Sequence, residues 1–186
     1  MTSDAERRLQ QRGVSIQDEP DVIGGVTVEP VDGAVAELPP YLDRQDELAA
    51  GDVRGQGAMA LVVSPEGIVL HLRDDKSWIP HPGCWSLFGG AVEDGENPDQ
   101  TIVRELWEEL HLTASEYRPL WRVVDAEGDG RLLTVFEVVT SMLPADMVLT
   151  EGQGLRAFSR DEALRQRLAP FCRRVLDRYP GCSGIR

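Results

Sequence analysis

Two short apolar runs flank a turn near residue 60. Residues 58–63 and 68–73 are rich in apolar and β-branched side chains, and Ser64-Pro65-Glu66-Gly67 separates them. Two such runs around a segment that contains Pro and Gly are typical of a β-hairpin. The pattern therefore predicts a pair of antiparallel strands at these positions.

A helical pattern begins near residue 97. Asn97 is a favourable N-cap residue, Pro98 suits the first helical position, and Gln100 stands three residues beyond the cap. These signals predict a helix over residues 97–110. The apolar positions that would anchor it to a core are Val103, Leu106 and Leu110.

The rest of the chain alternates between strand and helix patterns. Further strands are predicted at residues 85–88 (ahead of a Gly89-Gly90 loop), 118–124, 132–140 and 155–158. A capping box that begins at Ser159 opens one more helix, and Pro170 begins another over residues 170–179. Strands around a central helix, followed by terminal helices, favour an α/β fold (α+β mixed) in which helices cover a mixed sheet.

The first part of the chain differs from the rest in charge. Residues 1–50 hold 11 acidic residues and 4 arginines, a net charge of −7, whereas the whole chain carries −13. We expect an acidic N-terminal extension at residues 1–52, with a short helix at 5–11 and a strand at 26–28, ahead of one domain at 53–186. The extension is expected to cover part of the domain, to form a homodimer contact, or to be partly mobile.

Charge and composition restrict the classes of partner. A chain with a net charge of −13 lacks the basic character of general nucleic-acid binders. The sequence shows neither an apolar run long enough to span a bilayer nor a signal peptide, so we expect a cytoplasmic protein without a membrane partner. Its three cysteines have no metal-ligand spacing and are predicted to be reduced thiols.

Three carboxylates gather on the helix predicted at residues 97–110. Glu108 and Glu109 lie three and four residues after Glu105, which places all three in one arc of the helix. Like charges at this spacing repel, and Arg104 alone does not neutralise them. A solvated acidic face is the simple explanation. The alternative is a hard divalent cation such as Mg²⁺, which prefers oxygen ligands and would also attract a phosphate substrate to an acidic protein.

The stretch Gly90–Leu112 resembles the Nudix box, Gly-x₅-Glu-x₇-Arg-Glu-U-x-Glu-Glu-x-Gly-U, in which U is aliphatic. The matching positions are Gly90, Glu96, Arg104, Glu105, Leu106, Glu108, Glu109 and Leu112. The only departure is His111, which we expect to adopt the left-handed cap conformation that Gly usually takes. The order of elements resembles the Nudix hydrolase family over residues 58–179 and implies a Nudix-type α/β/α sandwich.

The resemblance implies a set of metal ligands and catalytic groups. The metal, Mg²⁺ with Mn²⁺ as a substitute, would be held by the Gly90 carbonyl, Glu105, Glu108, Glu109 and Glu151, and would lower the pKa of a bound water. Glu105, Glu108 or Glu151 would accept the proton of that water, Arg104 would orient a carboxylate, and Glu96 would brace the junction of loop and helix. Glu151 enters this set because Glu151-Gly152-Gln153 resembles a segment of the MutT branch of the family, although a Glu before Gly is otherwise an ordinary loop residue.

Candidate substrate contacts lie before the box. Arg73, at the end of a predicted strand, is the candidate phosphate contact, and an exposed charge at a strand end is the competing explanation. Trp78 and His81 would line a base pocket. Phe88 stands where family members often have Pro and would alter the pocket wall.

The implied function is Mg²⁺-dependent hydrolysis of a phosphoanhydride bond in a small nucleoside-diphosphate-linked substrate. The Glu-Gly-Gln segment favours a nucleoside triphosphate, with a nucleotide sugar, ADP-ribose or coenzyme A as the alternative. A diphosphate isomerase of the same fold would need a Cys and Glu pair, for which only Cys84 offers itself. A nucleotide-sensing module tends to lose box carboxylates that this chain retains, and a structural protein would have no use for them.

Overall fold

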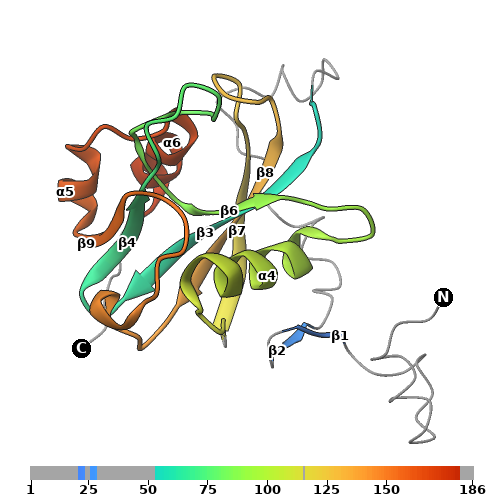
Figure 1. The fold of residues 1–186 in the computed structure, drawn as a ribbon. Coiled ribbons are helices and arrows are strands. Elements are labelled where there is room, and N and C mark those ends of the chain that lie inside the picture. The colour runs from blue at the N-terminus through green and yellow to red at the C-terminus, as the bar shows by residue number, and fades with distance from the viewer. Residues whose placement is uncertain (1–20, 24–25, 29–52, 115, 181–186) are drawn as a thin grey trace, which may run out of the picture.

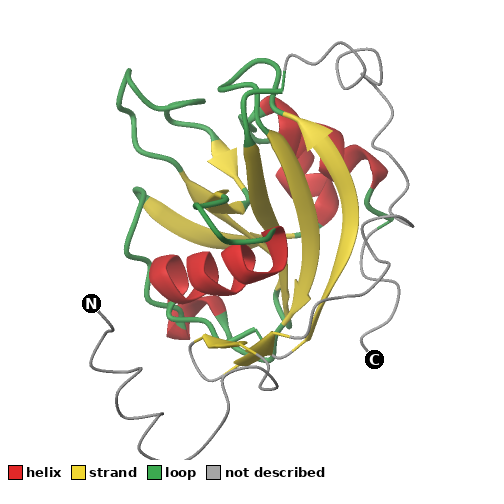
Figure 2. Cartoon of the chain, turned by 90° about the vertical axis from the view of Figure 1, so that its right-hand side faces the viewer, coloured by secondary structure: helices red, strands yellow, loops and turns green. Residues whose placement is uncertain are grey.

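A central sheet with helices on both faces forms the domain (Figures 1 and 2). The computed structural model describes residues 21–23, 26–28, 53–114 and 116–180. One face of the seven-stranded sheet carries α4 (Pro98–Leu110), and the other carries α5 (Arg160–Leu164) and α6 (Pro170–Arg178). The predicted sandwich of helices around a mixed sheet is confirmed.

Strand β3 (Gln56–Ser64) is the axis of the sheet. It forms the predicted antiparallel hairpin with β4 (Gly67–Leu72) and pairs in parallel with β8 (Leu132–Val139). Beyond these, β7 (Glu116–Val124) runs antiparallel to β8, and β9 (Gly154–Phe158) runs antiparallel to β4. All of these strands fall where the sequence predicts them, with shifts of one or two residues at the ends.

The strand predicted at residues 85–88 is in fact two strands. β5 (Trp85–Ser86) pairs with β4, whereas β6 (Phe88–Ala91) pairs with β3. β4 leaves β3 beyond the pair Val62–Val69, so the returning chain follows β4 first and then changes to β3 at Leu87. The prediction of one strand followed by a Gly-Gly loop was wrong, because both glycines belong to β6.

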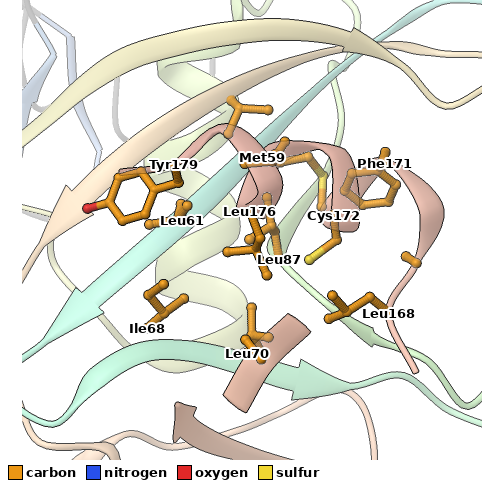
Figure 3. Close-up of a cluster of buried hydrophobic side chains, with 14 of the residues drawn as sticks. Met59, Leu61, Ile68, Leu70, Leu87, Leu168, Phe171, Cys172, Leu176 and Tyr179 are labelled. Carbon is orange, nitrogen blue, oxygen red and sulfur yellow. The ribbon is translucent and has the colours of Figure 1, made fainter. Parts of the chain in front are cut away.

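Both faces of β3 are buried, and its alternation divides the core in two. The residues that face α4 are Ala58, Ala60 and Val62, and those that face α6 are Met59, Leu61 and Val63. Figure 3 shows Met59 and Leu61 of the second set among the side chains of α6. Burial of one such large apolar side chain stabilises the fold by about 2 kcal/mol, so the position of β3 is strongly fixed.

The ends of α4 follow the predicted caps. The Asn97 side chain accepts the backbone N–H of Gln100 at 2.9 Å, and Gln100 Oε1 accepts the N–H of Asn97 at 3.0 Å, which completes a capping box. At the other end His111 has φ 49°, the expected left-handed conformation, and its N–H donates to the Trp107 carbonyl. The His111 ring stacks on Trp107 with centroids 5.4 Å apart.

The described part of the N-terminal segment is a two-stranded hairpin. β1 (Asp21–Ile23) and β2 (Val26–Val28) pair antiparallel, which confirms the strand predicted at residues 26–28. The helix expected at residues 5–11 lies outside the described residues. Among the helices that the structure describes, none has the length and apolar character needed to cross a membrane.

The left-handed cap predicts a specific effect of substitution at His111. His111→Gly is expected to leave kcat unchanged and to be neutral or stabilising by up to about 1 kcal/mol, because Gly adopts positive φ without strain. His111→Ala should be less stable than the Gly variant by about 1 kcal/mol. Urea unfolding of the three proteins measures both differences. A clearly destabilised Gly variant would show that the stack on Trp107 outweighs the backbone strain.

Candidate active site

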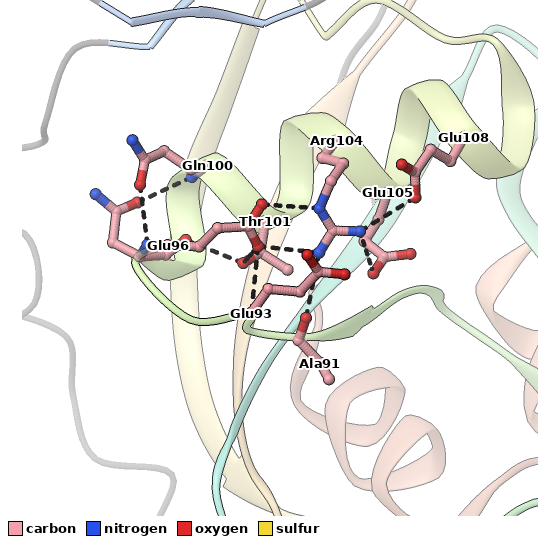
Figure 4. A network of polar contacts seen from close by, with 9 residues as sticks. Ala91, Glu93, Glu96, Gln100, Thr101, Arg104, Glu105 and Glu108 are labelled. Atoms are coloured by element: carbon pink, nitrogen blue, oxygen red, sulfur yellow. Dashed lines mark hydrogen bonds and ion pairs between the residues drawn. The ribbon is translucent and has the colours of Figure 1, made fainter. Parts of the chain in front are cut away.

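Arg104 is the centre of a network of acidic side chains (Figure 4). Its Nε and Nη2 donate to the two oxygens of Glu96 at 2.8 and 3.0 Å. Its Nη1 donates to Glu105 at 2.9 Å and to Glu108 at 3.1 Å, and Nη2 also reaches the Ala91 carbonyl. The bonds to Arg104 hold the pKa of Glu96 down at about 2, and the Glu96 carboxylate raises the pKa of Arg104.

Glu96 ties the loop before α4 to the helix. Its carboxylate accepts the Thr101 hydroxyl at 2.9 Å and the Glu93 N–H at 3.3 Å, in addition to Arg104. Two of these partners belong to α4 and one to the loop. Glu96 thus joins the loop to the first turns of α4, as expected from the sequence.

Glu105 packs directly on the backbone of β6. A Cβ on Gly90 would overlap Oε1 of Glu105, so any side chain at this position would displace the carboxylate. Burial raises the pKa of Glu105, as do the charges of Glu108 and Glu151, while Arg104 opposes them. The site thus needs glycine at position 90 for a steric reason.

Glu109 is the most buried carboxylate of the three on α4, with 7% of its surface exposed. Its Oε2 accepts the N–H of Gly89 at 2.8 Å. Burial raises its pKa to about 8, the charges of Glu105 and Glu151 add to the shift, and Gly89 and Arg73 oppose it. Near neutral pH, with no cation beside it, Glu109 holds its proton.

A distant loop docks on the C-terminal end of α4. The last carbonyl groups of a helix have no partner within the helix. Here the Glu108 carbonyl accepts the Thr150 hydroxyl at 2.6 Å, and the Glu109 carbonyl accepts the Thr150 N–H at 3.0 Å. The Val148 N–H reaches the Leu110 carbonyl at 3.3 Å. The docked loop places the next residue, Glu151, close enough to raise the pKa of both Glu105 and Glu109.

His71 is a member of the site that the sequence does not reveal. Its ring is buried in β4, stacks on Phe88 with centroids 4.8 Å apart, and has Nε2 3.1 Å from the Leu87 carbonyl. Burial lowers its pKa to about 4, so the ring is neutral and Nε2–H donates to Leu87. Its Nδ1 faces Gly152, where a Cβ would lie 3.3 Å away. The sequence gives no sign of these contacts, because a single polar residue within a strand pattern is usually solvent-exposed.

The candidate substrate contacts are dispersed. Phe88 is 0% exposed and belongs to the core on the α4 side, so its ring has no surface for a substrate and the expectation of a pocket contact is corrected. Trp78 is 79% exposed on the loop after β4. Arg73 lies beside Glu109 and is fixed by two bonds: its Nε donates to the Pro80 carbonyl, and its own carbonyl accepts Gln153 Nε2.

The donors at this site suit a hard divalent cation. Carboxylate and carbonyl oxygens are the ligands that Mg²⁺ prefers. Burial raises the pKa of Glu105 and Glu109, and the negative charges around them add to the shift. Across the described residues, no group of three or more His, Cys, Asp or Glu side chains already forms a ligand set. Arg104 occupies Glu105 and Glu108, and the Gly89 N–H occupies Glu109, so a cation would compete with these donors for the carboxylates.

The family model of the NUDIX domain matches residues 53–179. The chain belongs to the NUDIX family. It is 28% identical over 130 residues to the CTP pyrophosphohydrolase of Escherichia coli, which covers 69% of this chain and 93% of that protein. It is 32% identical over 60 residues to a nucleoside triphosphate pyrophosphatase/Nudix hydrolase fusion protein of Bifidobacterium longum, which covers 32% of this chain. This chain spans only 12% of the length of the fusion protein.

A solved structure agrees with the NUDIX fold. The NUDIX domain of NrtR from Shewanella oneidensis, in complex with ADP ribose, superposes with a TM-score of 0.56 at 17% identity and covers 80% of this chain and 96% of that chain. At this level of identity the likeness concerns the fold alone. All the site residues described above fall within the part that matches the NUDIX model.

The buried Glu109 of this NUDIX domain predicts how Mg²⁺ affects stability. A carboxyl group whose pKa rises from 4.5 to about 8 on folding stabilises the fold below pH 4.5, and this stability is lost as the pH rises through 8. A Mg²⁺ ion bound at Glu109 would have to replace this proton, so the gain in Tm that Mg²⁺ gives should be a few degrees larger at pH 8 than at pH 6. Thermal unfolding with and without Mg²⁺ measures this gain. In Glu109→Gln the gain should depend less on pH than in the wild type, because only Glu105 keeps a raised pKa there. A pH-independent gain in the wild type would contradict the prediction.

Proposed function

We propose that this chain is a Mg²⁺-dependent pyrophosphohydrolase that splits a phosphoanhydride bond in a nucleoside-diphosphate-linked substrate, with a nucleoside triphosphate favoured. The observation that carries the proposal is the crowding of carboxylates beside β6: Glu105 packs on Gly90, Glu109 accepts the Gly89 N–H, and the charge of Glu151 acts on both. Two of these carboxyl groups lie on α4, and a docked loop brings the third. Crowded carboxylates lower the free energy of unfolding, so their presence here supports a role in binding a cation.

The chain offers oxygen ligands for the cation and a residue to set their positions. Glu105, Glu108, Glu109, Glu151 and the Gly90 carbonyl would hold Mg²⁺, which neutralises diphosphate oxygens and acidifies the attacking water. Arg104 holds Glu105 and Glu108 toward one point. The partly buried bonds between Arg104 and Glu96 keep the guanidinium in place while the carboxylates change partner.

A carboxylate near the attacking water would accept its proton. Glu105, Glu108 and Glu151 are the candidates. Burial raises the pKa of Glu105, which makes it a stronger base than an ordinary exposed carboxylate. Glu108 has a largely exposed side chain and lacks this advantage.

The preference for a nucleoside triphosphate has two supports. The relative from Escherichia coli, which this chain matches over 93% of that protein, is named as a CTP pyrophosphohydrolase. In addition, Gln153 binds the Arg73 carbonyl at 2.6 Å and the Leu72 carbonyl through its backbone N–H at 2.8 Å. The segment that carries Glu151 therefore also fixes Arg73, which we propose as the phosphate contact. Cys84, which an isomerase would need in the site, lies in the core on the α6 side.

Glu108→Gln is expected to lower kcat by roughly a thousandfold, because the amide keeps the shape of the side chain and removes the charge. Thermal stability should change little, since the side chain is 57% exposed. The assay is release of monophosphate and phosphate from nucleoside triphosphates, ADP-ribose, a nucleotide sugar and coenzyme A with Mg²⁺. Glu66→Gln, on the exposed β3–β4 turn, is the matched control. Full activity of Glu108→Gln, or activity that persists in EDTA, would refute the assignment.

Glu151→Gln separates a ligand from a base. In both cases kcat should fall far more than KM rises, because the charge acts in the transition state. The Mg²⁺ concentration for half-maximal rate should increase only if Glu151 is a ligand. Thr150→Val removes the hydroxyl that holds the Glu108 carbonyl, so it should produce a smaller loss of kcat. Unchanged kcat and unchanged Mg²⁺ dependence in Glu151→Gln would exclude both roles.

A further inference from the structure

A cavity of about 130 Å³ lies against β6 on the side of the sheet away from α4. Its apolar lining consists of Met59 and Leu133 from the sheet and Phe171 from α6. Its polar lining comes from the loop after β4 and from the turn between β7 and β8. The polar side chains used below are Arg73, His81, Asp125 and Arg131.

A buried His–Asp pair forms one wall of this cavity. Nε2 of His81 lies 2.8 Å from Oδ1 and 3.0 Å from Oδ2 of Asp125. The two side chains are 9% and 5% exposed, although they come from segments 44 residues apart. His81 adopts φ 53°, a conformation that residues with a Cβ rarely adopt. The buried pair therefore joins two segments that are distant in the sequence, and its formation requires His81 to adopt an unfavourable backbone conformation.

The turn that carries Asp125 is held rigidly. The backbone N–H groups of Gly128 and Gly130 donate to the Asp125 carbonyl at 3.1 and 2.9 Å. From α6, Arg174 donates to both oxygens of Glu127 at 2.9 Å and to the Val124 carbonyl at 3.1 Å. The carboxylate is therefore positioned before any ligand arrives, as a specific binding site requires.

Two other charged residues of the same turn balance each other: Arg131 forms an ion pair with Asp129, and both line the cavity. Asp125, in contrast, has a ring N–H of His81 as its side-chain partner, and a carboxylate has more lone pairs than the one N–H of that ring can use. Asp125 therefore keeps lone pairs for a further hydrogen bond.

The cavity and the carboxylate cluster share the backbone of Gly90. One side of Gly90 borders the cavity, and the carboxylate of Glu105 packs on the same residue. Arg73 also belongs to both, because it lines the cavity and lies beside Glu109. A substrate with its phosphates at the carboxylates would therefore place its organic end in the cavity.

The dimensions and lining of the cavity restrict that organic group. A cavity of about 150 Å³ accommodates benzene, so about 130 Å³ suits a single six-membered ring. The apolar lining suits a planar ring, and the carboxylate of Asp125 selects a group that donates N–H. Cytosine presents an amino group on its edge, and Asp or Glu is a recognised acceptor for it. Uracil has a carbonyl oxygen at the same place, which a carboxylate repels.

We propose that this cavity is the base subsite, and that Asp125, held by His81, selects a pyrimidine that carries an amino group, as in cytosine nucleotides. The proposal rests on the proposed function, because it takes the phosphates to lie at the carboxylates. A purely structural bond between loop and turn is the competing explanation. It would affect the hydrolysis of all substrates equally.

Substrate analogues test the proposal on the unmodified chain. We expect kcat/KM for CTP to exceed that for UTP by roughly ten- to a hundredfold, the range for one hydrogen bond to a charged group. The triphosphate of 2-pyrimidinone riboside, which lacks the amino group, should be as poor as UTP. Equal values for CTP and either compound, or a GTP value that matches CTP, would overturn the proposal.

Substitutions distinguish a role of Asp125 in base selection from a purely structural role. Asn at position 125 both accepts and donates, so in Asp125→Asn the CTP to UTP ratio should approach one. Glu127→Gln loosens the turn that positions Asp125 through its bond to Arg174, so it should lower the CTP to UTP ratio, but less than Asp125→Asn does. Glu66→Gln, on the exposed β3–β4 turn, is the control and should keep the wild-type ratio. A ratio unchanged in Asp125→Asn would show a structural role only.

Binding without turnover distinguishes the two proposals. Calorimetry of CMP and UMP with the wild type, without metal, measures the cavity alone. If no triphosphate is hydrolysed but CMP binds more tightly than UMP, the proposed function fails and the base subsite stands. If CMP and UMP bind equally, or neither binds, the base subsite is overturned whatever the enzyme hydrolyses.

Discussion

The close approach of β6 to its neighbours on both sides is the constraint on which the site depends. A Cβ on Gly89 would overlap the Ala58 carbonyl of β3, and one on Gly90 would overlap Glu105 of α4. Without side chains, this strand brings a sheet, a helix and a cavity within one residue of each other. The Gly89 N–H then becomes a donor for Glu109, which allows a carboxylate to be buried there.

The site also requires Glu151 to lie near the carboxylates of α4, and the hydrogen bonds at the end of that helix place it there. The last turn of α4 needs donors for its carbonyl groups, and residues 148–150 supply them. The bonds that complete the helix are therefore the same bonds that bring Glu151 to the carboxylates. A local demand of the backbone thus fixes a long-range feature of the site, and Met147 and Leu149 add apolar contacts that anchor the same loop in the core on the α4 side.

Local signals explain how much of this was predictable from the sequence. The β3–β4 hairpin and both caps of α4 follow from turn residues, capping residues and a left-handed His111, all within a few positions of each other. The change of partner at Leu87 depends on where β4 leaves β3, which no local pattern records. Phe88 was misplaced for the same reason. The contacts of His71 with the Leu87 carbonyl and of His81 with Asp125 join residues 16 and 44 positions apart, so spacing along the chain gives no indication of them.

Arg104 has a consequence for how the protein depends on its metal supply. Many small metal-binding domains are unfolded without their ion, because nothing else balances the charges of the ligands. Here a guanidinium fixed by Glu96 takes up two of the carboxylates, and a backbone N–H takes up a third. These internal partners balance the carboxylates within the chain itself, so the fold does not need a bound cation for that purpose.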